Sequence, residues 1–172
     1  MTDIFNLLPE IIKSKNPDLK IPINSTLPNN NIVEIKEDSI EAKLKKITLT
    51  NFIEKKVFSF KLDNKKIKSI CNIFDKYADF FNKGCDAIIF AEINNQKYIF
   101  ICELKSDRPS SSDYENQFKS SNAFLDYLSS LLKHFYDIDL KEFKRKNILF
   151  MSGSIKQTTG TKYKEKIHIL KE

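Results

Sequence analysis

The hydrophobic positions of the chain switch between helical and strand spacing and predict a mixed α/β fold. Apolar residues at helical spacing predict helices over residues 2–14, 40–46, 66–82 and 112–135. Apolar runs or period-two alternation predict strands over residues 32–36, 57–62, 85–90, 98–105, 147–152 and 166–170. Residues 15–31 contain several prolines and a run of asparagines, which predicts a surface loop.

The most regular helical pattern lies over residues 112–135. Ser112 and Glu115 have the spacing of a capping box, in which each side chain bonds a backbone N–H at the start of a helix. The residues expected on its buried stripe are Tyr114, Phe118, Ser121, Leu125, Leu128, Leu132 and Phe135. Gln117 lies on a flank of this stripe, in the first turns of the helix.

Length and composition fit one domain over residues 1–172. Hydrophobic residues make up 41% of the 172 residues and charged residues 30%, which allows a sizeable core. No apolar stretch approaches the ~20 residues of a membrane-spanning helix, and the N-terminus lacks the basic segment of a signal peptide. We therefore expect a cytoplasmic α/β chain that engages no membrane, with a central mixed β-sheet flanked by helices. Cys85 and Cys102 lie in apolar runs without a CxxC spacing, so we expect core thiols.

The two apolar runs at residues 85–90 and 98–105 carry charged residues that a buried strand would not normally hold. Asp86 stands at the start of the first run, and Glu103 and Lys105 stand at the end of the second. An ionised carboxylate in a buried strand is costly unless a charged group pairs with it or a cation binds it. The hairpin therefore predicts a cation or a phosphate at this place.

Turn chemistry predicts which residues of this hairpin face one another. The asparagines at 94–95 tolerate the positive φ of a two-residue turn, and such a turn fixes the pairing of both flanking strands. Counting outward from the turn pairs Asp86 with Glu103, which places their Cβ atoms about 5 Å apart. Lys105 follows one step further on the same face. A slip of one residue would put the two acids on opposite faces, so the interpretation depends on the turn.

The order of these elements resembles the PD-(D/E)XK nuclease superfamily, over about residues 84–152. A strand with Asp86, a hairpin, a strand ending in Glu-x-Lys, a helix and a further strand follow one another. Glu103-Leu104-Lys105 matches the (D/E)-x-K signature, and Gln117 matches a glutamine that several branches carry on the following helix. The tripeptide alone occurs by chance in many proteins, and it gains weight from the apolar strands that hold both acids.

Two positions depart from the pattern of the superfamily. Cys85 stands where the signature has proline, a change that is common in the superfamily. Many members carry an additional glutamate on the first helix, and here the choice stays open among Glu10, Glu34, Glu37 and Glu41.

The resemblance implies a metal-dependent endonuclease with a restriction-endonuclease-like fold, which hydrolyses DNA and leaves a 5′-phosphate. Asp86, Glu103 and the backbone carbonyl of Leu104 would hold Mg²⁺ (or Mn²⁺), a hard cation that takes oxygen ligands. Such an ion can stabilise charge at the scissile phosphate and activate a water. Lys105 would orient that water or stabilise the developing negative charge, and Gln117 would position the lysine or the water.

Other interpretations of the same residues stay open. Asp86 could lie in solvent at the start of a strand, and Glu103 and Lys105 could form a surface ion pair worth under ~1 kcal/mol. Gln117 could be an ordinary surface glutamine, with Lys119 in its place. The alternative function is a catalytically inactive protein of the same fold that binds nucleic acid or a partner protein.

The charge of the chain is compatible with a nucleic-acid partner. The net charge is +6, but the basic residues are spread along the chain, and each cluster alone is typical of a solvated surface. A chain of this size has little room for a separate recognition domain, so specificity would come from a second copy, a partner protein or the structure of the nucleic acid. Restriction or anti-phage defence, junction resolution and repair all fit, and we favour defence by analogy. The sequence does not distinguish DNA from RNA.

Overall fold

The computed structural model has a mixed α/β architecture with two four-stranded sheets. It describes residues 3–12, 23–27, 30–37, 40–53, 55–62, 83–106, 110–151 and 169–170. The predicted α/β class and the mixed sheet are confirmed, whereas the second sheet is not predicted by the sequence pattern. The helix predicted over residues 66–82 lies outside the described residues. In the described part of the chain, no helix combines the length and the apolar character needed to cross a membrane.

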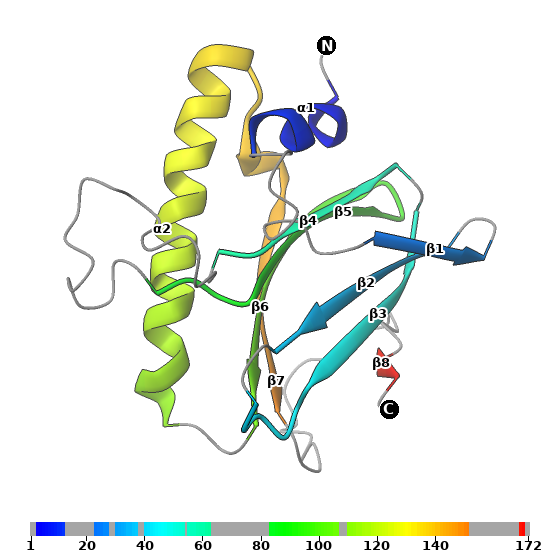
Figure 1. Cartoon of the computed structure of the whole chain (residues 1–172). Helices are drawn as coiled ribbons and strands as arrows, with labels where there is room; N and C mark the ends of the chain where they lie inside the picture. Colours follow the sequence, from blue (N-terminus) through cyan, green and yellow to red (C-terminus); the bar gives the residue numbers. More distant parts are fainter. Residues whose placement is uncertain are drawn as a thin grey trace.

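The mixed sheet has the strand order β4-β5-β6-β7. Antiparallel pairing joins β4 (Val57–Phe60), β5 (Ala87–Ile93) and β6 (Gln96–Lys105), and β7 (Lys144–Met151) then pairs parallel to β6. Two parallel neighbours need a crossover connection, and α2 (Ser111–Tyr136) supplies it along one face of the sheet (Figure 1). The C-terminal ends of β6 and β7 therefore lie at the same end of the sheet.

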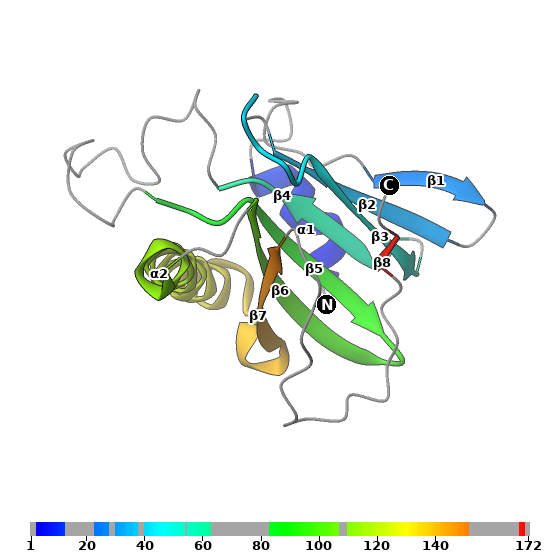
Figure 2. The ribbon, with the colours of Figure 1, turned by 90° about the horizontal axis from the view of Figure 1, so that it is seen from below.

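The second sheet is antiparallel, with the order β1-β2-β3-β8. Its strands are β1 (Ile23–Leu27), β2 (Asn30–Lys36), β3 (Lys46–Phe52) and the two-residue β8 (Ile169–Leu170). Figure 2 shows this sheet on one side of the mixed sheet and α2 on the other. The mixed sheet is thus the middle layer, which explains why β4 and most of β5 are buried on both faces.

The second sheet corrects two predictions. The loop predicted over residues 15–31 contains β1 and the start of β2, and its remaining residues 15–22, 28 and 29 lie outside the described residues. The helix predicted over residues 40–46 is wrong, because residues 40–41 form a turn and β3 begins at Lys46. The pairing of β2 with β3 buries apolar side chains of both strands against the mixed sheet, and this burial outweighs the local helix preference.

Two apolar clusters fill the spaces between the layers. One lies between α1 (Ile4–Ile11), α2 and the mixed sheet, and the other lies between the two sheets. Cys85 belongs to the first cluster and Cys102 to the second, and both are buried free thiols as expected. The predicted stripe of α2 is confirmed at its buried positions Phe118, Ser121, Leu125, Leu128 and Leu132. It is wrong at Phe135, which is 68% exposed in the last turn of the helix.

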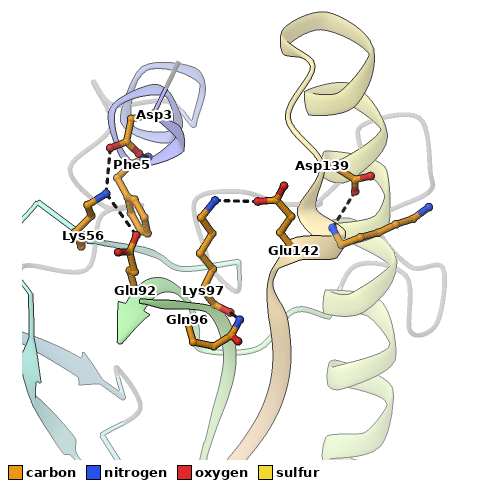
Figure 3. A network of polar contacts seen from close by, with 9 residues as sticks. Asp3, Phe5, Lys56, Glu92, Gln96, Lys97, Asp139 and Glu142 are labelled. Carbon is orange, nitrogen blue, oxygen red and sulfur yellow. Dashed lines mark hydrogen bonds and ion pairs between the residues drawn. The ribbon is translucent and has the colours of Figure 1, made fainter. Parts of the chain in front are cut away.

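A network of ion pairs fastens α1 to the end of the sheet where β6 begins (Figure 3). Asp3 caps α1 by accepting a hydrogen bond of 3.0 Å from the N–H of Phe5. The Lys56 ammonium bridges Asp3 at 3.5 Å and Glu92 of β5 at 3.4 Å. This end of the molecule is therefore held by structural pairs, at the opposite end of β6 from Glu103 and Lys105.

Candidate functional site

The predicted hairpin register is confirmed. Residues 94–95 have φ angles of 51° and 60°, as a two-residue hairpin turn requires. The ladder of β5 with β6 runs from this turn to Ala87 opposite Cys102. One position further from the turn, Asp86 lies beside Glu103, and both are on the face of the sheet that is directed toward α2.

Backbone and side-chain contacts interlock the two acids. The N–H of Asp86 donates to Glu103 Oε2 at 3.3 Å, and the N–H of Leu104 donates to Asp86 Oδ2 at 2.7 Å. Lys105 Nζ lies 2.7 Å from Glu103 Oε1. The structure therefore brings together the three charged residues that the sequence selects, with both carboxylates held by the chain itself.

Glu103 is buried to a degree that excludes a surface ion pair. Its side chain is 1% exposed, and it is the one charged residue among the buried residues that the structure describes. Burial raises the pKa of Glu103 most strongly, while the hydrogen bond and charge of Lys105 and the amide of Gln117 lower it, and the net shift is upward. The carboxylate therefore lies in surroundings that disfavour its negative charge.

Asp86 is strongly perturbed as well. Burial raises its pKa to about 7, and the negative charge of Glu103 adds to the rise, while the N–H of Leu104 and the charge of Lys105 oppose it. Burial lowers the pKa of Lys105, but the contact with Glu103 and the nearby acids raise it by more, so its ammonium stays charged. At neutral pH the Lys105 ammonium therefore lies beside Glu103, whose pKa is raised, and near Asp86, whose pKa of about 7 leaves its carboxyl group partly ionised.

The helix α2 positions the segment that leads into Asp86. Ser121 Oγ accepts a hydrogen bond of 2.9 Å from the N–H of Cys85, and Gln117 Nε2 donates to the carbonyl of Gly84 at 3.4 Å. Gln117 Oε1 is buried and accepts no hydrogen bond from the residues that the structure describes. Gln117 therefore lies at the site, while Lys119 is exposed on the helix. The sequence predicts Ser121 only as a member of the buried stripe of the helix and does not indicate its hydrogen bond with Cys85.

Of the four candidate glutamates, Glu37 is the one whose charge reaches the pair. It follows β2, and its negative charge contributes to the raised pKa of Asp86. Glu34 forms ion pairs with two lysines of the second sheet, and Glu10 and Glu41 are exposed. Glu37 directly follows a strand of the second sheet, whereas the resemblance implies a glutamate on a helix.

The oxygen atoms at the site fit a hard divalent cation with few protein ligands. Within the described ranges, no group of three or more His, Cys, Asp and Glu side chains is arranged to hold a metal ion. Mg²⁺ often takes only one or two carboxylates and completes its shell with water, which Asp86 and Glu103 match. In an extended strand the N–H and C=O of one residue point to the same edge, so the carbonyl of Leu104 faces the edge where its N–H meets Asp86.

Ser106 connects this site to the second sheet, a contact that the sequence gives no signal for. Its Oγ accepts hydrogen bonds from the N–H groups of Lys43 at 2.7 Å and Leu44 at 3.3 Å. Figure 1 shows the start of β3 and the end of β6 at the same end of the molecule. The chain segment before β3 is therefore fastened next to Lys105.

Comparison of the chain with protein-family models, with curated proteins and with solved structures finds no match. The fold and the site define a mixed α/β protein with a buried glutamate, a partly buried aspartate and a lysine at one end of a mixed sheet.

Proposed function

We propose that the chain is a metal-dependent endonuclease with a restriction-endonuclease-like fold, a member of the PD-(D/E)XK superfamily that hydrolyses phosphodiester bonds in DNA. The observation that carries the proposal is the pair of Glu103, which is buried, and Asp86, which is partly buried, with Lys105 Nζ 2.7 Å from Glu103 Oε1. The order of elements around the pair supports it, because an antiparallel hairpin, a helix and a parallel strand follow one another as the resemblance implies.

The energetics of the pair favour a bound cation. Two neighbouring carboxyl groups that are withdrawn from water destabilise each other when both are ionised. Burial and the charge of Glu103 together raise the pKa of Asp86 to about 7. A divalent cation held by both carboxylates would offset the repulsion and favour the ionised form of each. A purely structural hairpin would gain more from two apolar residues at these positions.

The residues of the site divide the work of hydrolysis. Asp86, Glu103 and the carbonyl of Leu104 would hold Mg²⁺ or Mn²⁺, which supplies charge stabilisation at the phosphate and an activated water. Lys105 would donate to the developing negative charge or orient the water. Gln117 Oε1, buried and without a described partner, would accept a hydrogen bond from that water.

The test compares the wild type with Glu103→Gln, which keeps the shape of the side chain and removes its charge. Mn²⁺ is titrated into both proteins by calorimetry, and nicking of supercoiled plasmid is assayed on the same samples. We expect Glu103→Gln to lose metal binding and nicking together. The control is Glu92→Gln, at the far end of the same hairpin in an ion pair with Lys56, which should keep both. Nicking by Glu103→Gln at the wild-type rate would contradict the proposal.

A second function has specific support, namely a catalytically inactive protein of the same fold that binds nucleic acid. Both acids already accept hydrogen bonds from the chain, and the described residues offer no third side chain arranged as a metal ligand. This function predicts salt-sensitive binding of DNA that neither Mg²⁺ nor Glu103→Gln changes. Metal-dependent turnover would exclude it.

The biological context is proposed by analogy. A second copy, a partner protein or a distinctive nucleic-acid structure would supply the choice of target. Restriction or anti-phage defence is the setting that we favour.

A further inference from the structure

The segment between β2 and β3 presents an unusual surface next to the candidate site. Residues 40–41 form a turn, and Ile40 is 94% exposed, the most exposed large hydrophobic side chain of the described residues. Lys43 and Lys45 are exposed on the same segment. Lys45 Nζ donates to the carbonyl of Ile40 at 2.5 Å, so the segment is folded back on itself. We call residues 40–45, which carry these two lysines and the exposed Glu41, the basic turn.

Three contacts hold the basic turn beside the carboxylates. Ser106, which directly follows Lys105, accepts hydrogen bonds from the N–H groups of Lys43 and Leu44 at 2.7 and 3.3 Å. On the other side, the N–H of Glu37 donates to the carbonyl of Lys45 at 3.0 Å. Ser106 directly follows Lys105, and the charge of Glu37 acts on Asp86, so these contacts hold the basic turn close to the candidate site.

We propose that the basic turn is a nucleic-acid contact, in which Lys43 and Lys45 meet backbone phosphates and Ile40 packs against a base. The proposal rests on the proposed function, since it names the part of the chain that receives the substrate of that site.

Electrostatics explain why such a contact is needed. The acids Glu37, Asp86 and Glu103 gather negative charge at the point where a polyanionic strand has to approach. Lysines placed beside that point attract the strand while leaving the acids available for a cation. Apolar side chains on nucleic-acid-binding surfaces insert between base steps, and an isoleucine at the tip of a lysine-bearing turn has the chemistry for that contact. An acidic protein segment would also pair with the lysines, so its binding is an outcome of the test.

The first test measures binding of a short fluorescein-labelled DNA duplex by anisotropy, in EDTA and over a range of salt concentrations, so that cleavage plays no part. The double variant Lys43→Gln/Lys45→Gln should bind more weakly. Its slope of log affinity against log salt should fall by nearly 2, because each phosphate contact on duplex DNA contributes about 0.9. The control Lys141→Gln removes an exposed lysine at the other end of the sheet and should leave the slope unchanged.

Two further variants, each with its own control, test the contact of Ile40 with a base and the hydrogen bonds of Ser106 without changing the charge of the chain. A duplex carrying 2-aminopurine should brighten when the wild type unstacks the base, and Ile40→Ala should remove that signal. Ile53→Ala, at an exposed isoleucine beyond the other end of β3, should keep it. Ser106→Ala removes the acceptor of the basic turn without changing charge and should weaken binding, whereas Ser106→Thr keeps the hydroxyl and should restore it.

Each result decides between the alternatives. An unchanged salt slope in the lysine double variant, or an equal change in Lys141→Gln, would overturn the proposal, and so would a wild type that binds an acidic peptide but no DNA. If the double variant lost its fold by circular dichroism, Lys43→Gln alone should show about half the change in slope. If the lysine variants bind DNA like the wild type while Glu103→Gln still abolishes nicking, the nuclease proposal holds and the basic turn is not the DNA contact. If the salt slope depends on the lysines but no metal-dependent nicking occurs, the basic turn is a DNA contact and the nuclease proposal is wrong.

Discussion

Replacing Asp86 with asparagine should make the metal-free protein more stable at neutral pH. The carboxyl group of Asp86 has a pKa of about 7 in the folded chain against an ordinary value of 3.8, because burial and the charge of Glu103 disfavour its ionised form. At about 1.4 kcal/mol per pKa unit, the difference corresponds to about 4 kcal/mol. Asparagine keeps an oxygen that accepts the hydrogen bond from the N–H of Leu104 and carries no charge to destabilise.

The sign of the pH dependence follows from proton binding. Between about pH 4 and pH 7 the folded chain binds more protons at Asp86 than the unfolded chain does. The contribution of Asp86 to the free energy of unfolding should therefore be largest at and below about pH 4 and should fall as the pH rises toward 7. Asp86 and Glu103 interact, so the fall belongs to the pair, and Asp86→Asn should remove the larger part of it.

Urea unfolding measured from pH 4 to pH 8, in EDTA and again with Mn²⁺, provides the assay. In EDTA the curves should separate toward neutral pH, with Asp86→Asn the more stable protein. Mn²⁺ at 100 times its dissociation constant should stabilise the wild type by about 2.7 kcal/mol and should leave the variant unchanged. Asp126→Asn, which removes an exposed carboxylate paired with Arg145, should change stability by less than ~1 kcal/mol at every pH. A stability difference between Asp86→Asn and the wild type that does not grow from pH 4 to pH 7 would refute the reasoning.

Two further predictions concern α2 and need no metal. Ser121→Ala should cost about 1–3 kcal/mol of unfolding free energy, because the buried N–H of Cys85 loses its acceptor, whereas Ser130→Ala on the exposed face should cost less than ~0.5 kcal/mol. Leu132→Ala should cost about 2–5 kcal/mol because Leu132 is fully buried, and Leu131→Ala, at a partly exposed neighbour, should cost less than half as much. Denaturant titration of each pair checks the difference, and equal losses within a pair would contradict the assigned burial.

The hairpin could be predicted from the sequence because its geometry is determined locally. Two asparagines that adopt positive φ set the turn, and strand alternation then carries the register outward to Asp86 and Glu103 without help from the rest of the chain. The helix α2 could be predicted for the same reason, since its apolar stripe repeats over many turns. The prediction that Phe135 is buried is wrong because an apolar stripe shows which face of a helix is apolar and does not show where the core ends.

The second sheet could not be predicted, because its stability comes from partners that lie far away in the sequence. Lysines and an alanine around residues 40–46 favour a helix locally, yet the pairing of β3 with β2 decides the structure. The alternation of Ile47 and Leu49 with threonines is a signal for β3 that could have been used. No sequence pattern indicates the roles of Ser106 and Glu37, because a serine in a polar loop and a glutamate after a strand are common in proteins of every class.

The paired acids and the neighbouring basic turn are held by contacts of different sequence separation, which affects the order of folding and the ease of local opening. Asp86 and Glu103 are 17 residues apart and are aligned by one hairpin, so the loop that must close is short. Ser106 and Lys43 are 63 residues apart, and their contact requires both sheets. We therefore expect the paired acids to form early and to survive partial opening, while the basic turn detaches whenever the second sheet loosens.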